Sequence, residues 1–226
     1  MFILEWLFPR FCIGCGFLGE YLCLRCINLL KIKQNLCFYC EKPSPSGITH
    51  FLCVPRGPIT GNLNLYQYGG LMVKIIHSYK YQLNQLIIKR FLSQALQLQA
   101  SRIKVFLPST RALLIPVPLE QERIHQRGFN QSLTICHHLS SWLNLQTANV
   151  VIKTRKTQPQ AGIKNKKYRE RNIKGAFKVI NSKIINKKDI IIVDDLVTTG
   201  ATINEIACVL KKAGAGRIYS FALARP

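Results

Sequence analysis

The stretch "IIIVDDLVTTGAT", residues 190–202, decides the fold. Four apolar β-branched residues run directly into two carboxylates, Asp194 and Asp195, and a short Thr/Gly loop follows. A continuous apolar run of this kind predicts a strand with both faces covered by helices, as in a parallel sheet. Carboxylates at the end of a buried strand are unfavourable unless a ligand or partner contacts them. The sequence therefore predicts a binding site at this strand end.

The loop after the acidic pair has the composition of a phosphate-binding loop. It leads into a predicted helix over 202–213, whose first N–H groups and positive dipole end attract anions. Gly200 permits close backbone approach, and the neighbouring threonines offer hydroxyl donors. The stretch is neither a Walker loop nor a dinucleotide fingerprint. A ribose 5-phosphate, with Mg²⁺ as an option on the carboxylates, has the matching geometry.

Strands and helices alternate along the rest of the chain, which predicts an α/β fold with a mainly parallel sheet flanked by helices. Alternating or continuous apolar runs predict the strands, and spacings of three and four residues predict the helices. The predicted strands are 62–70, 112–117, 149–153, 175–180, 189–195 and 217–224. The predicted helices are 129–143 and 202–213, with one or two more over 71–99.

Seven of the nine cysteines lie between residues 12 and 53. They form three C-x-x-C pairs and a His-x-x-Cys pair, and this gap lets two side chains bind one zinc ion, with Zn–S distances of about 2.3 Å. Two pairs complete a closed, tetrahedral, structural site. Sequential pairing gives two sites: Cys12, Cys15, Cys23 and Cys26, then Cys37, Cys40, His50 and Cys53. The alternatives are crossed pairing, and an exposed His50 that leaves one zinc ion per chain.

The chain of 226 residues has room for a full domain and a small module. We place a helix and a double zinc-ribbon module at 1–56 and the larger domain at 57–226, after the Pro/Gly-rich "VPRGPITG". The opening "MFILEWLFPR" predicts a short amphipathic helix rather than a signal peptide. No apolar run reaches about 18 residues, so we predict no transmembrane helix and a cytoplasmic protein with reduced cysteines.

The charge of the chain is strongly positive. Lys and Arg total 32 against 10 Asp and Glu, for a formal net charge of +22. Thirteen of these basic residues lie between residues 153 and 188, more than a small phosphate ligand needs. A solvated basic face is one explanation, and a nucleic-acid partner is the other. Tyr168, inside this basic run, suits stacking on a base of a single strand.

Three segments resemble known families. "VDDLVTTGAT" is similar to the signature of type I phosphoribosyltransferases, which bind phosphoribosyl pyrophosphate (PRPP). "PVPLEQERIHQRGFNQS" (116–132) and "TQPQAGIKNKKYRERNIKGAF" (157–177) resemble segments of the ComF family of competence proteins, and the paired C-x-x-C start belongs to that family too. The family often has a fourth C-x-x-C where this chain has His50-x-x-Cys53.

The resemblance implies a role for each matching residue. Asp194 and Asp195, the candidate catalytic residues, would face the ribose hydroxyls directly or through Mg²⁺-bound water. The turn after "LLIPVP" would take the place of the pyrophosphate loop. The implied PRPP-binding residues are Val197, Thr198, Thr199, Gly200, Ala201 and Thr202, with Arg123 and Arg127 as contacts for pyrophosphate or nucleic-acid phosphates.

Two functions are consistent with these residues. The first is a phosphoribosyltransferase-like protein that binds PRPP and, as the resemblance implies, handles single-stranded DNA during natural transformation. It would act with the DNA-uptake machinery at the cytoplasmic side of the inner membrane. The alternative is an active phosphoribosyltransferase of nucleotide metabolism, whose acceptor the sequence does not identify. The two are compatible, because one pocket could serve both.

Overall fold

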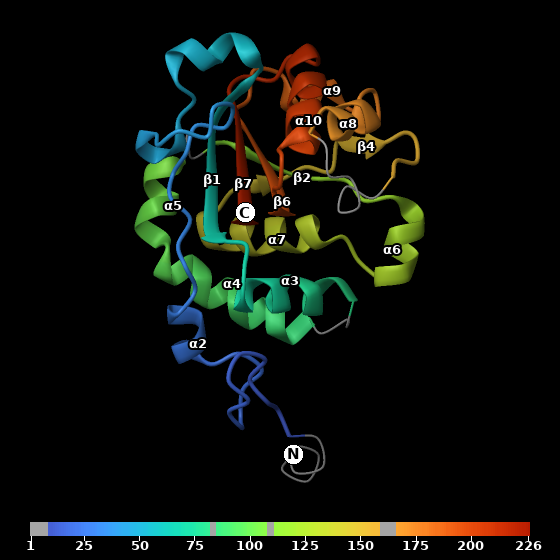
Figure 1. Cartoon of the computed structure of the whole chain (residues 1–226). Helices are drawn as coiled ribbons and strands as arrows, with labels where there is room; N and C mark the ends of the chain where they lie inside the picture. The colour runs from blue at the N-terminus through green and yellow to red at the C-terminus, as the bar shows by residue number, and fades with distance from the viewer. Residues whose placement is uncertain (1–8, 82–84, 108–110, 159–165) are drawn as a thin grey trace.

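Five parallel strands form the central sheet of the computed structural model, which describes residues 9–81, 85–107, 111–158 and 166–226 (Figure 1). Their order across the sheet is β1-β7-β6-β2-β3. The strands are β1 (Ile59–Gln67), β2 (Leu113–Pro116), β3 (Gln146–Thr147), β6 (Ile190–Leu196) and β7 (Ile218–Arg225). The predicted α/β fold with a mainly parallel sheet is confirmed.

Helices cover both faces of the sheet, and β6 shows why the apolar run is continuous. Ile191 and Val193 belong to the core beneath α3 (Leu71–Tyr81), α4 (Gln85–Leu98) and α7 (Gln131–Leu143). Ile190 and Ile192 point to the other face and pack with α10 (Ala201–Lys212). Successive side chains of a strand alternate between its faces, so every position of this run is buried. Within the described ranges, none of the helices combines the length and apolar character that crossing a membrane requires.

Two of the predicted strands lie outside the main sheet. β4 (Val151–Lys153) and β5 (Phe177–Val179) pair with each other in an antiparallel ribbon. The ribbon and α8 (Lys166–Ile173) pack against α10 (Figure 1). The sequence analysis did not predict the short helices α5 (Ala100–Phe106), α6 (Gln121–Arg127), α8 and α9 (Ser182–Ile185). Helices this short give little periodicity to detect.

The cysteine-rich segment shares its packing with the larger domain. It contains α2 (Leu24–Asn28), η1 (Pro45–Gly47) and η2 (Phe51–Arg56), and its chain runs along β1 from one end of the sheet to the other (Figure 1). Cys26 and Ile27 lie in the same core as the buried faces of α3 and α4. The boundary at residue 57 stays a prediction, and the helix predicted at the start of the chain falls on residues 1–8, outside the described residues.

Gly47 shows how closely this segment is packed on β1. Its φ is +73°, and a Cβ there would lie 1.9 Å from the carbonyl oxygen of Asn62. We expect Gly47→Ala to lower the free energy of unfolding by about 3 kcal/mol, because it adds a backbone clash to left-handed strain. Gly175→Ala is the matched control, since Gly175 has φ +71° and open space around it. It should lose only about 1 kcal/mol. Equal losses in urea unfolding would contradict the packing described here.

Candidate functional site

A cavity of about 580 Å³ opens where β2 and β6 end. One wall is formed by residues 194–203, and the facing wall by residues 117–120, by α6 and by the first turn of α7. Lys153, Thr157 and Gln158 close the third side. All the residues predicted to bind PRPP line this single cavity: Arg123, Arg127, Asp194, Asp195, Val197, Thr198, Thr199, Gly200, Ala201 and Thr202.

The acidic pair is held by neighbours that the sequence analysis did not identify. Asp194 Oδ1 accepts hydrogen bonds from Ser132 Oγ and from the backbone N–H of Asp195, both at 2.9 Å. Ser132 reaches it because the Asn130 side chain caps α7 and accepts from the backbone N–H of Ser132 at 3.0 Å. Asp195 is buried, with 6% of its surface exposed. The two carboxylates therefore have different surroundings: hydroxyl and amide donors orient Asp194, whereas Asp195 is enclosed by its neighbours.

The Thr/Gly loop has the backbone that a phosphate site requires. Gly200 occupies the N-cap position of α10 in the left-handed region, with φ +79°. Thr199 Oγ1 accepts from the backbone N–H of Ala201 at 3.4 Å. Arg169 of α8 donates to Thr198 Oγ1 at 2.9 Å. The Thr198 hydroxyl can then direct its own proton at a ligand, and the Arg169 guanidinium adds positive charge beside the loop.

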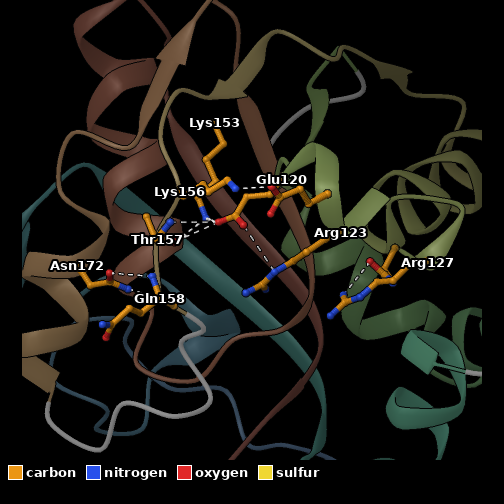
Figure 2. Close-up of polar contacts among 10 residues, drawn as sticks. Glu120, Arg123, Arg127, Lys153, Lys156, Thr157, Gln158 and Asn172 are labelled. Carbon is orange, nitrogen blue, oxygen red and sulfur yellow. Dashed lines mark hydrogen bonds and ion pairs between the residues drawn. The ribbon is translucent and has the colours of Figure 1, made fainter. Parts of the chain in front are cut away.

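Glu120 organises the facing wall (Figure 2). Its Oε1 accepts from Lys153 Nζ at 2.5 Å and from the backbone N–H of Thr157 at 3.2 Å, and its Oε2 lies 3.8 Å from Arg123 Nε. Burial would raise the pKa of the Glu120 carboxyl, but the hydrogen bonds from Lys153 and Thr157 outweigh it and hold this pKa below its ordinary value. The family-like segments 116–132 and 157–177 therefore meet at this carboxylate.

A smaller depression of about 320 Å³ adjoins the cavity and shares Thr157 and Gln158 with it. Gln158 is fixed by two bonds with Asn172, which accepts from its N–H at 3.1 Å and donates to its carbonyl at 2.9 Å (Figure 2). Lys156, Tyr168 and Arg171 complete the lining. Tyr168 is 53% exposed, so the depression beside the cavity combines an accessible aromatic residue with two basic ones.

The cysteines and His50 form two groups, and the grouping is the sequential one. Cys12, Cys15, Cys23 and Cys26 make the first group, and Cys37, Cys40, His50 and Cys53 make the second. Within each group the ligand atoms lie within 4.8 Å of one another. The Cys23 sulfur lies 3.7 Å from those of Cys12 and Cys15, and a tetrahedron with Zn–S bonds of 2.3 Å has edges of about 3.8 Å. The residues present fit a four-ligand metal site.

The hydrogen bonds of His50 support its place in the second group. Its Nε2 lies 3.1 Å from the carbonyl oxygen of Pro43, which only accepts, so Nε2 carries the proton. Its Nδ1 then presents a lone pair, 3.3 Å from the Cys40 sulfur. A ligating histidine commonly has its second nitrogen fixed in this way. Burial would raise the pKa of Cys37, but backbone N–H groups, including that of His50, lower it to about 7.

The fold and the cavity define a protein of the phosphoribosyltransferase class, and the profile of the family described as "Phosphoribosyl transferase domain" matches residues 130–226. Competence protein F of Haemophilus influenzae is 37% identical, over 91% of this chain and 97% of its own length. The DNA utilization protein YhgH of Escherichia coli K12 is 32% identical, over 92% of both chains. Competence protein ComFC of Bacillus subtilis is 29% identical, over 91% of this chain and 85% of its own. The chain belongs to the ComF family of competence proteins.

Metal analysis tests the two cysteine groups. We expect two zinc ions per chain in the purified protein, one ion in Cys53→Ser, and two in His50→Cys, because a thiolate satisfies the same site. Cys208→Ser, which changes a half-buried cysteine of α10 outside both groups, should keep two. A single zinc ion in the wild-type protein would rule out the predicted site with His50, and no zinc would rule out both sites.

Proposed function

We propose that the cavity binds PRPP with Mg²⁺ and that the protein uses this site while handling single-stranded DNA in natural competence. The PRPP part of the proposal is supported by how the residues of one cavity are arranged. A carboxylate pair and a helix-capping Thr/Gly loop lie on one wall, and basic side chains lie on the wall that faces them. PRPP has the three complementary parts: ribose hydroxyls, a 5-phosphate and a pyrophosphate.

In this proposal each group of lining residues binds one part of PRPP. Asp194 and Asp195 orient the ribose hydroxyls, and residues 197–202 with Arg169 bind the 5-phosphate. Arg123 and Arg127 lie where the pyrophosphate would extend. Mg²⁺, when bound, neutralises part of the pyrophosphate charge and makes it a better leaving group. The residues of the chain supply the position and the fixed charge around it.

Zinc in the two cysteine groups has a structural role in this proposal. Four protein ligands per site leave no position for a substrate. The first group packs into the core with α3 and α4, and the second contributes Phe38 to the core around α10. Metal binding at each group would therefore stabilise a different part of the fold. Removal of zinc by a chelator should lower the stability of the fold, because zinc takes no part in the reaction itself.

The DNA part of the proposal is supported by charge and by the names of the relatives. The net charge of +22 exceeds what one PRPP molecule requires. Similar proteins are named for competence and for DNA utilization. The depression beside the cavity is lined by Tyr168, Lys156 and Arg171, and so offers an aromatic side chain together with basic ones. We place this activity on the cytoplasmic side of the inner membrane, with the DNA-uptake machinery as partner.

An active phosphoribosyltransferase of nucleotide metabolism is the second candidate. The observation that favours it is the preformed basic wall, in which Glu120 already fixes Arg123 and Lys153 at the cavity. Catalysis of transfer needs such fixed charges around the departing pyrophosphate. The two candidates differ in one measurable way, since only the enzyme consumes PRPP and releases pyrophosphate when its acceptor is present.

The double change Asp194→Asn, Asp195→Asn tests the pocket. We expect PRPP affinity in the presence of Mg²⁺ to fall about 100-fold by titration calorimetry, because two charged hydrogen-bond acceptors are lost. Asp189→Asn is the control, since this carboxylate precedes the same strand and pairs with Arg217 instead. Unchanged PRPP binding would refute the site. Transformation that survives the double change would show that the pocket is not needed for DNA uptake.

Salt dependence tests the DNA contact. If the protein neutralises roughly four phosphates of a single-stranded oligonucleotide, doubling the salt concentration should lower its affinity about sevenfold. Tyr168→Ala should weaken binding about tenfold by fluorescence anisotropy, and Tyr168→Phe should not, because the ring face remains. Binding that ignores salt, or no binding to single strands, would count against the DNA role.

A further inference from the structure

The turn between Cys37 and Cys40 is packed against the phosphate loop. Phe38, inside this turn, is buried, and its ring atom Cζ lies 2.6 Å from where a Cβ on Gly200 would stand. The ring therefore rests directly on the Gly200 backbone. Phe38 also belongs to the same apolar core as Val197 and Ala201, which flank the loop on both sides. A residue that lies between two cysteines of the second group thus packs directly beneath the loop.

Tyr39 ties the same turn to the first turn of α10. Its hydroxyl accepts from the backbone N–H of Ile59 at 2.9 Å and lies 3.2 Å from Asn204 Oδ1, to which it donates. Burial raises the pKa of Tyr39 to about 12, so the hydroxyl keeps its proton at neutral pH. The rings of Phe38 and Tyr39 meet edge to face, with centroids 5.1 Å apart. Because Asn204 donates its N–H to the Gly200 carbonyl, Tyr39 holds the residue that closes the first turn after the loop.

A third contact joins the turn to the end of β7. Glu41 Oε1 accepts from Arg225 at 2.7 Å, and the Arg225 guanidinium lies 5.9 Å from the centre of the Phe38 ring. Arg225 is itself 3% exposed. The turn 37–41 therefore contacts the phosphate loop, α10, β1 and β7. The side chains of this turn also contact each other, since the Phe38 and Tyr39 rings meet edge to face. By contrast, the first cysteine group packs elsewhere. Gly14, between Cys12 and Cys15, lies beside Leu71, and Cys26 lies in the core with α3 and α4.

We infer that the turn 37–41 sets the shape of the phosphate loop, so that metal binding at the second cysteine group controls phosphate binding in the cavity. Phe38 and Tyr39 are positioning residues that act through Gly200 and Asn204. The inference rests on the proposed PRPP site and adds its regulation. The physical reason is that the loop needs Gly200 in the left-handed region, and the Phe38 ring packed against Gly200 restrains the backbone that sets the directions of its N–H groups. Cys37 and Cys40 hold the ends of the turn that supplies this packing.

Phe38→Ala tests the inference with two ligands that occupy different ends of the cavity. We expect affinity for ribose 5-phosphate to fall about tenfold in calorimetry, while affinity for pyrophosphate with Mg²⁺ stays within about twofold. Zinc content should remain two per chain. Tyr39→Phe should show a smaller loss of the same kind. Phe17→Ala is the matched control, because Phe17 follows the first C-x-x-C pair and is 65% exposed. Equal loss of both ligands, or no loss of either, would overturn the inference.

Amide hydrogen exchange tests the inference without any ligand. Residues 196–206 should exchange faster in Phe38→Ala and in Cys53→Ser, and at the wild-type rate in Phe17→Ala and Cys15→Ser. Faster exchange in both cysteine variants, or in neither, would refute a specific role for the second group. If the wild-type protein binds no PRPP, the proposed function fails, while this exchange pattern still shows whether the turn holds the loop.

Discussion

The burial of β6 on both faces is the constraint on which the site depends. Its four apolar residues have no face in solvent, so polar chemistry is confined to the point where the strand ends. Asp194 and Asp195 lie at that point, and the loop that follows them leads directly into α10. Ser132 from α7 and Glu120 ahead of α6 then approach the same point, because their helices pack against or follow neighbouring strands. One buried strand thus gathers residues that lie far apart along the chain.

The local sequence pattern was enough to predict the parts of the site that consecutive or closely spaced residues form. The strand, acidic pair and loop occupy consecutive residues, and each cysteine pair repeats one short spacing. Contacts between distant segments gave no such signal. Arg169 looked like one more charge in a basic run, yet it bonds Thr198. Thr157 and Glu120 lie 37 residues apart and meet at the cavity wall. β4 pairs with β5 outside the main sheet, and β5 packs against α10, contacts that the sequences of the two strands do not indicate.

The facing walls of the cavity have opposite character, and Glu120 explains how the basic one is stable. Arg123 and Lys153 would repel each other without a shared counter-charge, and a half-buried carboxylate without donors would be unfavourable. Together they form a group with a net charge of +1 that keeps its geometry. Fixed charges of this kind need no rearrangement when an anion arrives. The acidic pair on the other wall is suited to hydroxyls or a cation, so the cavity offers separate positions to the uncharged and the anionic parts of a ligand.

The path of the cysteine-rich segment along β1 has a consequence for self-association. β1 is an edge strand of the sheet, and an open edge offers its backbone groups to other chains. Here the chain between the two cysteine groups occupies that edge, since Lys33 donates to the Leu65 carbonyl and Gln67 donates to the Lys31 carbonyl. The opposite edge is β3, which is only two residues long. The N-terminal segment therefore protects this edge of the sheet, and a chain that lost it would expose the unpaired backbone groups of a nine-residue strand to other chains.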